Sequence, residues 1–234
     1  MTFLDELEMF GSVVAVIDQH DNRYSYRDLM LLTERFAEKV DFSKKKIILI
    51  LCENNIESFI AYLATLRADS VAMLVDAGID ESLLDNLIRT YAPHYIWRPK
   101  EGANNWFYQF GRYILTKQGD EGNLPLHRDL SLLLSTSGTT GSSKLVRLTK
   151  ANLHSNARSI SAYLKLCQGQ KPITLLPMHY SYGLSVINSH RSVGATILLT
   201  TASLMTRPFW DFFRAKGATS FAGVPYTFEM LKKL

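Results

Sequence analysis

The sequence predicts an α/β fold, with mostly parallel sheets sandwiched by helices. Two continuously apolar runs of strand length, Ile47–Cys52 and Val71–Val75, alternate with segments of helical periodicity. Such runs are typical of strands covered on both faces, and helices of about 10 to 15 residues between strands favour βαβ units. The chain has 234 residues, 47% of them apolar, which is enough for one large domain or two smaller ones.

Taken in order, each predicted helix carries apolar residues three or four positions apart, which places them on one face. These helices begin at Tyr24–Leu29, near Asn54, after an Asp80 N-cap, and at Leu153. Besides the two apolar runs, strands are expected at 94–97, directly before residue 135, and at 173–176, 195–199 and 219–222.

Three segments do not follow the alternation of strands and helices. Aromatic residues between 100 and 123 predict a hairpin or an edge insertion, to which we assign no function. The sequence Gly169–Pro172 predicts a break, with a subdomain seam at that point. His154 falls on the polar face of its helix, so we expect it to face solvent rather than to bind a ligand.

Composition excludes several classes of protein. A net charge of +4 is spread along the chain, and its densest run, Lys44–Lys46, leads into a strand, so no nucleic acid is expected as partner. Cys52 and Cys167 fit neither a metal site nor a disulfide framework. Neither a signal peptide nor an apolar run of about 20 residues is present, so no membrane span is expected and the protein is predicted to be cytoplasmic.

The stretch Leu132–Lys144 combines groups suited to a polyphosphate. Three leucines end a buried strand, and a run of hydroxyls and glycines follows. Gly138 and Gly141 lack the Cβ atoms that keep a backbone away from a ligand, and Lys144 adds a positive charge. A plain surface loop has the same composition. A Walker loop does not fit, because Ser143 and Leu145 stand where it needs a glycine and a Ser or Thr.

This stretch resembles the phosphate-binding loop of the adenylate-forming superfamily, Ser/Thr-Ser-Gly-Ser/Thr-Thr-Gly-x-Pro-Lys. The superfamily includes acyl-CoA synthetases, the adenylation domains of peptide synthetases, and luciferases. Residues 136–141 and Lys144 match, while Ser143 replaces the usual proline. The downstream pattern Leu-Thr-x-x-Asn-Leu is present at Leu148–Leu153.

The resemblance implies that the loop binds ATP. The residues it assigns to nucleotide binding are Thr136, Ser137, Gly138, Thr139, Thr140, Gly141 and Lys144. Among these, Thr139 and Lys144 are implied to act in catalysis, with Mg²⁺ as the metal cofactor. The chain itself is expected to supply no metal ligand.

A second cluster, Pro177–Gly183, directly follows a predicted strand, at the end where open α/β sheets bind ligands. It resembles the family pattern Pro-x-x-His/Phe/Trp-x-x-Gly, in which the aromatic lies beside the acyl group. Tyr180 holds that position, and we assign it a catalytic part as a substrate gate, because tyrosine is a poor base near neutral pH. His179 is implied to bind substrate, with any acid–base role left open. Packing of the strand–helix corner is the alternative.

A third segment, Gly223–Leu231, resembles the family's Gly-Val-Pro-x-x-Phe/Tyr-x-x-Leu pattern. The helix it opens lies near the substrate pocket in the family, so Phe228 is implied to line that pocket. Ordinary core packing explains Phe228 nearly as well.

The activity implied is that of an ATP-dependent acid–thiol ligase. A carboxylic acid attacks the α-phosphate of ATP to give an acyl-adenylate, which then passes to coenzyme A or to phosphopantetheine on an acyl carrier protein. The family's adenine motif, ribose aspartate and C-terminal lysine are not in the sequence, so we expect an N-terminal portion that is inactive alone. The alternative is a truncated, non-catalytic homologue that binds a nucleotide or a partner. By analogy, residues 51–170 form the first sheet, and 1–50 with 171–234 form the second.

Overall fold

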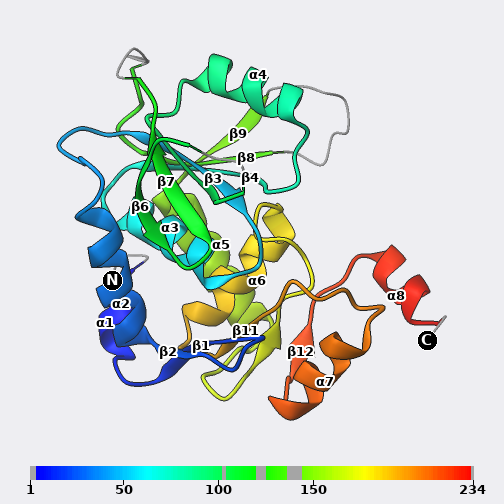
Figure 1. Cartoon of the computed structure of the whole chain (residues 1–234). Helices are drawn as coiled ribbons and strands as arrows, with labels where there is room; N and C mark the ends of the chain where they lie inside the picture. The colour runs from blue at the N-terminus through cyan, green and yellow to red at the C-terminus, as the bar shows by residue number, and fades with distance from the viewer. Residues whose placement is uncertain (1–3, 102–103, 120–124, 136–143, 233–234) are drawn as a thin grey trace. The chain divides into compact units, whose positions relative to one another are not determined.

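A computed structural model describes residues 4–101, 104–119, 125–135 and 144–232 (Figure 1). The chain divides into two compact units, each built on one sheet. The five-stranded unit comprises Met1–Met30, Asn54–Ile56 and His154–Leu234, and the seven-stranded unit comprises Leu31–Glu53 and Glu57–Leu153. Both units have helices flanking mixed, mainly parallel sheets, so the predicted α/β class is confirmed.

The seven-stranded sheet has a parallel centre and antiparallel edges. Its strands in spatial order are β6 (Trp106–Phe110), β7 (Tyr113–Lys117), β5 (Tyr95–Pro99), β3 (Ile47–Cys52), β4 (Val71–Asp76), β8 (Leu130–Ser135) and β9 (Leu145–Thr149). Strands β5, β3, β4 and β8 run parallel, β6 and β7 form the predicted hairpin at one edge, and β9 is antiparallel at the other. All six residues of β3 are buried, as expected for a strand covered on both faces.

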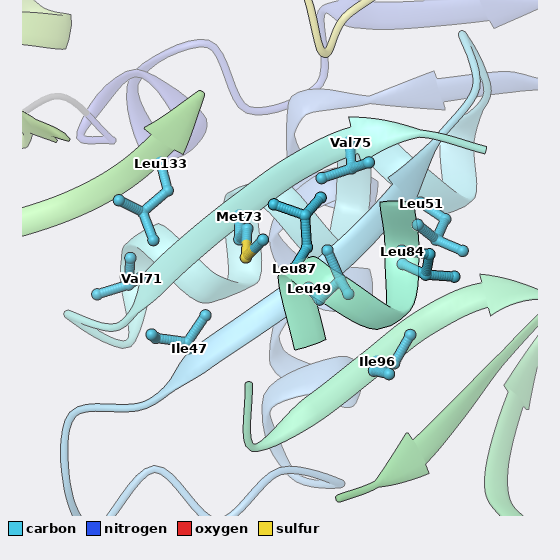
Figure 2. Close-up of a cluster of buried hydrophobic side chains, with 10 residues drawn as sticks. All are labelled: Ile47, Leu49, Leu51, Val71, Met73, Val75, Leu84, Leu87, Ile96 and Leu133. Carbon is cyan, nitrogen blue, oxygen red and sulfur yellow. The ribbon is translucent and has the colours of Figure 1, made fainter. Parts of the chain in front are cut away.

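Helices cover both faces of this sheet. Figure 2 shows one face, where Leu84 and Leu87 of α4 (Glu81–Tyr91) pack on side chains of β3, β4, β5 and β8. On the other face, the Trp97 ring meets Phe36 of α2 (Tyr26–Ala37) edge-on, with 5.2 Å between ring centroids. The Trp97 indole N–H also donates to the Glu57 carbonyl of α3 (Ile56–Arg67) at 3.0 Å. The alternation of side chains along each strand therefore fills two apolar layers.

The five-stranded sheet is built from shorter strands. Its order is β12 (Ser220–Phe221), β10 (Pro172–Ile173), β11 (Ile197–Leu199), β1 (Val14–Asp18) and β2 (Arg23–Ser25), with only β2 antiparallel. Phe209 and Phe212 of α7 (Arg207–Ala215) pack on Ile17, Ile173 and Leu198 of this sheet. The remaining helices are α1 (Glu6–Met9), α5 (Lys150–Tyr163), α6 (Ser181–Arg191) and α8 (Pro225–Leu231).

A buried ion pair lies inside the five-stranded unit. Arg191 at the end of α6 donates to Glu6 at 3.3 Å, and both side chains are almost fully enclosed. Burial raises the pKa of Glu6, which the Arg191 charge opposes. The Tyr26 hydroxyl donates to the Ala195 carbonyl at 2.8 Å, and burial raises its pKa as well.

Several expected borders differ from the observed ones. Residues 1–50 were expected to form one sheet with 171–234. Strand β3 bonds instead to β4 and β5, so Leu31–Glu53 lies in the seven-stranded unit. At the other border, His154–Leu234 forms one block, because α5 packs on α6: the Ser161 hydroxyl donates to the Ser189 carbonyl at 3.1 Å. His154 is half-buried rather than solvent-facing. Strand β9 was not predicted from the sequence.

Candidate active site

The phosphate-loop motif begins and ends on two paired strands. Ser135, the last residue of β8, is the ladder partner of Leu145, the first residue of β9. The motif residues Thr136, Ser137, Gly138, Thr139, Thr140, Gly141 and Ser143 lie outside the described residues. Because β8 runs parallel to β4, Ser135 is at the carboxyl end of the parallel strands, where open α/β sheets bind ligands.

Lys144 is the one charged residue of the motif that the structure describes. It is exposed and directly precedes β9. The backbone N–H of the next residue, Leu145, donates to the Tyr91 hydroxyl at 3.0 Å, and the Leu145 side chain packs against the apolar cluster beneath α4. Tyr91 therefore fixes the chain directly after Lys144, and sequence reasoning missed this anchor.

The second predicted cluster lies in the five-stranded unit, where Asn54 holds the turn before α6. The Asn54 amide N–H donates to the Leu176 carbonyl at 3.2 Å, and its side-chain oxygen accepts from the Met178 N–H at 2.9 Å. One side chain thus satisfies a backbone acceptor and a backbone donor that no strand pairs. In the sequence, the place of Asn54 just after an apolar strand predicted the start of a helix. It did not predict the contact with this turn.

The lack of space at position 183 explains why the Pro177–Gly183 pattern ends in a glycine. A Cβ at position 183 would lie 2.2 Å from the Pro177 carbonyl oxygen and 2.7 Å from that of Leu176. Both are backbone atoms, so a larger residue requires α6 or the turn to move. The first turn of α6 is therefore pressed onto the end of the preceding segment.

The structure places the predicted substrate residues on this turn and on α8. Tyr180 is the N-cap residue of α6, in an extended conformation, and His179 precedes it; both side chains are half-buried. Phe228 lies on α8 with its side chain 50% exposed, and its ring stacks on Phe221 with 6.2 Å between centroids. The exposed ring of Phe228 argues against the simple core-packing alternative.

The structure brings Tyr180 and His179 together on one turn, within the same unit as Phe228. Lys144 belongs to the seven-stranded unit. Cys52, at the end of β3, is buried, and burial raises the pKa of its thiol, so it is no candidate nucleophile. Within the described ranges, no group of three or more His, Cys, Asp or Glu side chains is arranged to hold a metal ion.

The whole chain matches one protein family. The family is described as AMP-binding enzyme, the match spans residues 3–234, and the chain therefore belongs to it. An oxalate–CoA ligase from Arabidopsis thaliana is 32% identical over 105 residues, which are 44% of this chain and 20% of that protein.

Two solved structures have the same fold. MatB from Rhodopseudomonas palustris with ATP bound is 21% identical, with a TM-score of 0.76 over 99% of this chain and 51% of its own. O-succinylbenzoate coenzyme A synthetase from Bacillus subtilis, in complex with ATP and magnesium, is 17% identical, with a TM-score of 0.76 over 98% of this chain and 64% of its own. The chain thus spans about half to two thirds of these proteins. Among the helices described, none has the length and apolar character needed to span a membrane.

Proposed function

We propose that this chain is the N-terminal portion of an ATP-dependent ligase that activates a carboxylic acid as its acyl-adenylate. One observation carries the proposal: in this member of the AMP-binding family, the phosphate-loop motif begins at the carboxyl end of β8. The oxalate–CoA ligase relative and the two ATP-bound structures support ATP and a carboxylic acid as substrates. Because the chain covers only part of its relatives, the activity is proposed for the full-length protein, and we expect these 234 residues alone to be inactive.

The loop's proposed part in the reaction is electrostatic. As the substrate carboxylate oxygen bonds to the α-phosphorus, the bond to the β-phosphate oxygen breaks and pyrophosphate leaves with the charge. Thr139, Thr140 and the Lys144 ammonium are proposed to donate hydrogen bonds to that charge. The exposed Lys144 directly after the loop fits this part. Mg²⁺, when bound, would neutralise further phosphate charge; we assign it to no residue of this chain.

The turn before α6 is proposed to shape the acyl site. Tyr180 would act as the gate, His179 and Phe228 as further substrate contacts, and the thiol of coenzyme A or of a carrier phosphopantetheine would displace AMP from the acyl group. The contacts of Asn54 and Gly183 support this assignment, because they fix the backbone on both sides of Tyr180. Groups that orient a substrate need such support.

Replacing the loop hydroxyls in the full-length enzyme tests the proposal. Thr139→Ala and Thr140→Ala should each lower the rate of carboxylate-dependent pyrophosphate exchange by roughly 10²–10³-fold, the usual cost of removing one donor to a developing charge. Thr90→Ala, on the exposed side of α4, is the matched control and should leave the rate unchanged. Unchanged exchange in both loop variants would overturn the role assigned to the loop, whereas no exchange by the unmodified full-length protein would favour a non-catalytic homologue.

Tyr180 variants test the gate separately. Tyr180→Phe should keep the adenylation rate, because only the ring's shape and apolar area are needed. Tyr180→Ala should weaken acyl binding by about 1–3 kcal/mol and relax the preference for substrate size. Equal losses in both variants would give the hydroxyl a chemical role instead. Rates are normalised to folded protein, so that a variant that only folds poorly is recognised.

A further inference from the structure

A cavity of about 470 Å³ lies in the seven-stranded unit. The residues lining it are Ile47, Tyr91, Pro125, Leu126, His127, Leu130, Leu133, Arg147, Leu148 and Thr149. Ile47 and Leu130 begin β3 and β8, and Thr149 ends β9, so the cavity is at the amino ends of the parallel strands. Ligands of open α/β sheets normally bind at the other end, where Ser135 and Leu145 lie.

The lining is mostly apolar, and among its few polar residues Arg147 supplies a positive charge. Arg147 is the ladder partner of Leu133, so both side chains are on the same face of the sheet. Leu133 belongs to the apolar cluster beneath α4, as Figure 2 shows. Arg147 is exposed and takes part in none of the ion pairs found among the described residues.

The charges around the cavity favour an anion. No Asp or Glu is among the lining residues, while Arg147 is; the His127 ring, which also lines the cavity, lies 3.8 Å from the Asp129 carboxylate, so the argument rests on Arg147. Pockets of about 300–1,000 Å³ with apolar walls and a few placed polar groups are typical sites for small organic molecules. A guanidinium offers a planar pair of N–H donors that matches the two oxygens of a carboxylate.

We propose that this cavity binds a small monocarboxylate with an apolar body. Its carboxylate pairs with the Arg147 guanidinium, and its body packs against Leu130, Leu133 and Ile47. The residues lining this cavity include none of those proposed for the acyl-adenylate site, so the proposal does not depend on that assignment. Tyr91 lines the cavity and also accepts the hydrogen bond from the Leu145 N–H, so a bound molecule alters the surroundings of that amide.

Octanoate and octanol are suitable probes, because they share an apolar chain and differ in charge. The measurement is NMR titration of the protein carrying ¹³C-labelled leucine methyls and ¹⁵N amides. Octanoate should produce saturable shifts at the Leu133 methyls and the Leu145 amide, with an affinity about 10- to 100-fold higher than octanol, the range for one charge-assisted hydrogen bond. Arg147→Gln should remove that difference.

Matched variants make the result decisive. Arg128→Gln removes a charge from a side chain that is 90% exposed and does not line the cavity, so it should bind octanoate as the unmodified protein does. Leu126→Trp fills the cavity and should abolish binding of both probes. Equal affinities for octanoate and octanol, equal effects of Arg147→Gln and Arg128→Gln, or shifts confined to the Tyr180 turn would each overturn the proposal.

Discussion

The two sheets differ in what holds their strands. In the seven-stranded sheet, β3 and β4 are six residues long and pair along their whole length, from Ile47 with Val71 to Cys52 with Asp76. In the five-stranded sheet, β10 and β12 have two residues each. The long strands bury continuous apolar runs, whereas the short ones bury only a few residues each, and side chains from elsewhere bond to the backbone beyond their ends.

Gln19 and Asn54 illustrate the second kind of support. The Gln19 side-chain oxygen accepts from the Thr200 hydroxyl at 3.0 Å and from the Thr201 N–H at 3.1 Å, at the end of β11. Asn54 holds the chain beyond β10 in the same way. Both units have an apolar core, and the comparison teaches that the unit with the shorter strands adds polar contacts between distant residues to hold the segments that follow its strands.

Breaking the Glu6–Arg191 pair should have the largest effect on stability. Arg191→Met leaves a buried carboxyl without its partner and should lower the free energy of unfolding by about 3–5 kcal/mol in urea denaturation. Adding Glu6→Leu should restore most of that loss, since no buried charge then remains. Arg214→Met breaks an exposed pair of 3.8 Å and should cost less than about 1 kcal/mol. If Arg191→Met cost no more than Arg214→Met, the buried ion pair would contribute no more to stability than an exposed one.

Creating a cavity in the core of the seven-stranded unit should have the second largest effect on stability. Leu49, at the centre of β3, is fully buried, so Leu49→Ala should lower the free energy of unfolding by about 2–5 kcal/mol. Leu31→Ala, in the same unit but 44% exposed, is the control and should change it by less than about 0.5 kcal/mol. Similar costs for the two variants, measured by urea denaturation, would contradict the view that apolar burial holds this unit.

The same contrast explains how far the sequence predicts the structure. Strand β3 was predicted from end to end, because six apolar residues between polar ones carry the signal locally. Strand β10 was predicted as 173–176 but ends at Ile173, since Leu176 and Met178 bond to Asn54, 122 and 124 positions away. Local patterns contain no information about such partners. For the candidate site, the motif and the Tyr180 turn are predictions from the resemblance, whereas the contacts of Asn54 and Tyr91 came only from the structure.

Asn54 tests whether these polar contacts also support the site. Asn54→Ala leaves the Met178 N–H and the Leu176 carbonyl without that partner and should cost about 1–3 kcal/mol in the free energy of unfolding. In the full-length enzyme it should also relax substrate-size preference, because the Tyr180 backbone loses its anchor. Asn156→Ala, on the exposed side of α5, is the control. A loss of stability with an unchanged size preference would limit Asn54 to folding.

The smallest expected difference concerns how helices begin in the two units. Asp80 caps α4, and its carboxylate accepts from the N–H groups of Ser82 at 2.9 Å and Leu83 at 3.4 Å. Thr206 precedes α7 but makes no such bond, and its hydroxyl donates to the Ser203 carbonyl instead. Asp80→Ala should therefore lower the urea midpoint, and Thr206→Ala should lower it less.

Acid pH separates this cap from a general helix effect. Hydrogen bonds from Ser82 lower the pKa of Asp80 below its ordinary value of 3.8, so the folded state favours the charged carboxylate. The stability that the charge contributes is fully present above pH 3.8 and is lost as the pH falls through the lower folded pKa. The difference in urea midpoint between the unmodified protein and Asp80→Ala should therefore stay constant at neutral pH and shrink in acid. Asp80→Asn, which retains the cap without the charge, should cost less than Asp80→Ala at neutral pH, and its cost should also shrink in acid. An Asp80→Ala cost that is independent of pH would assign the effect to helix propensity rather than to the cap.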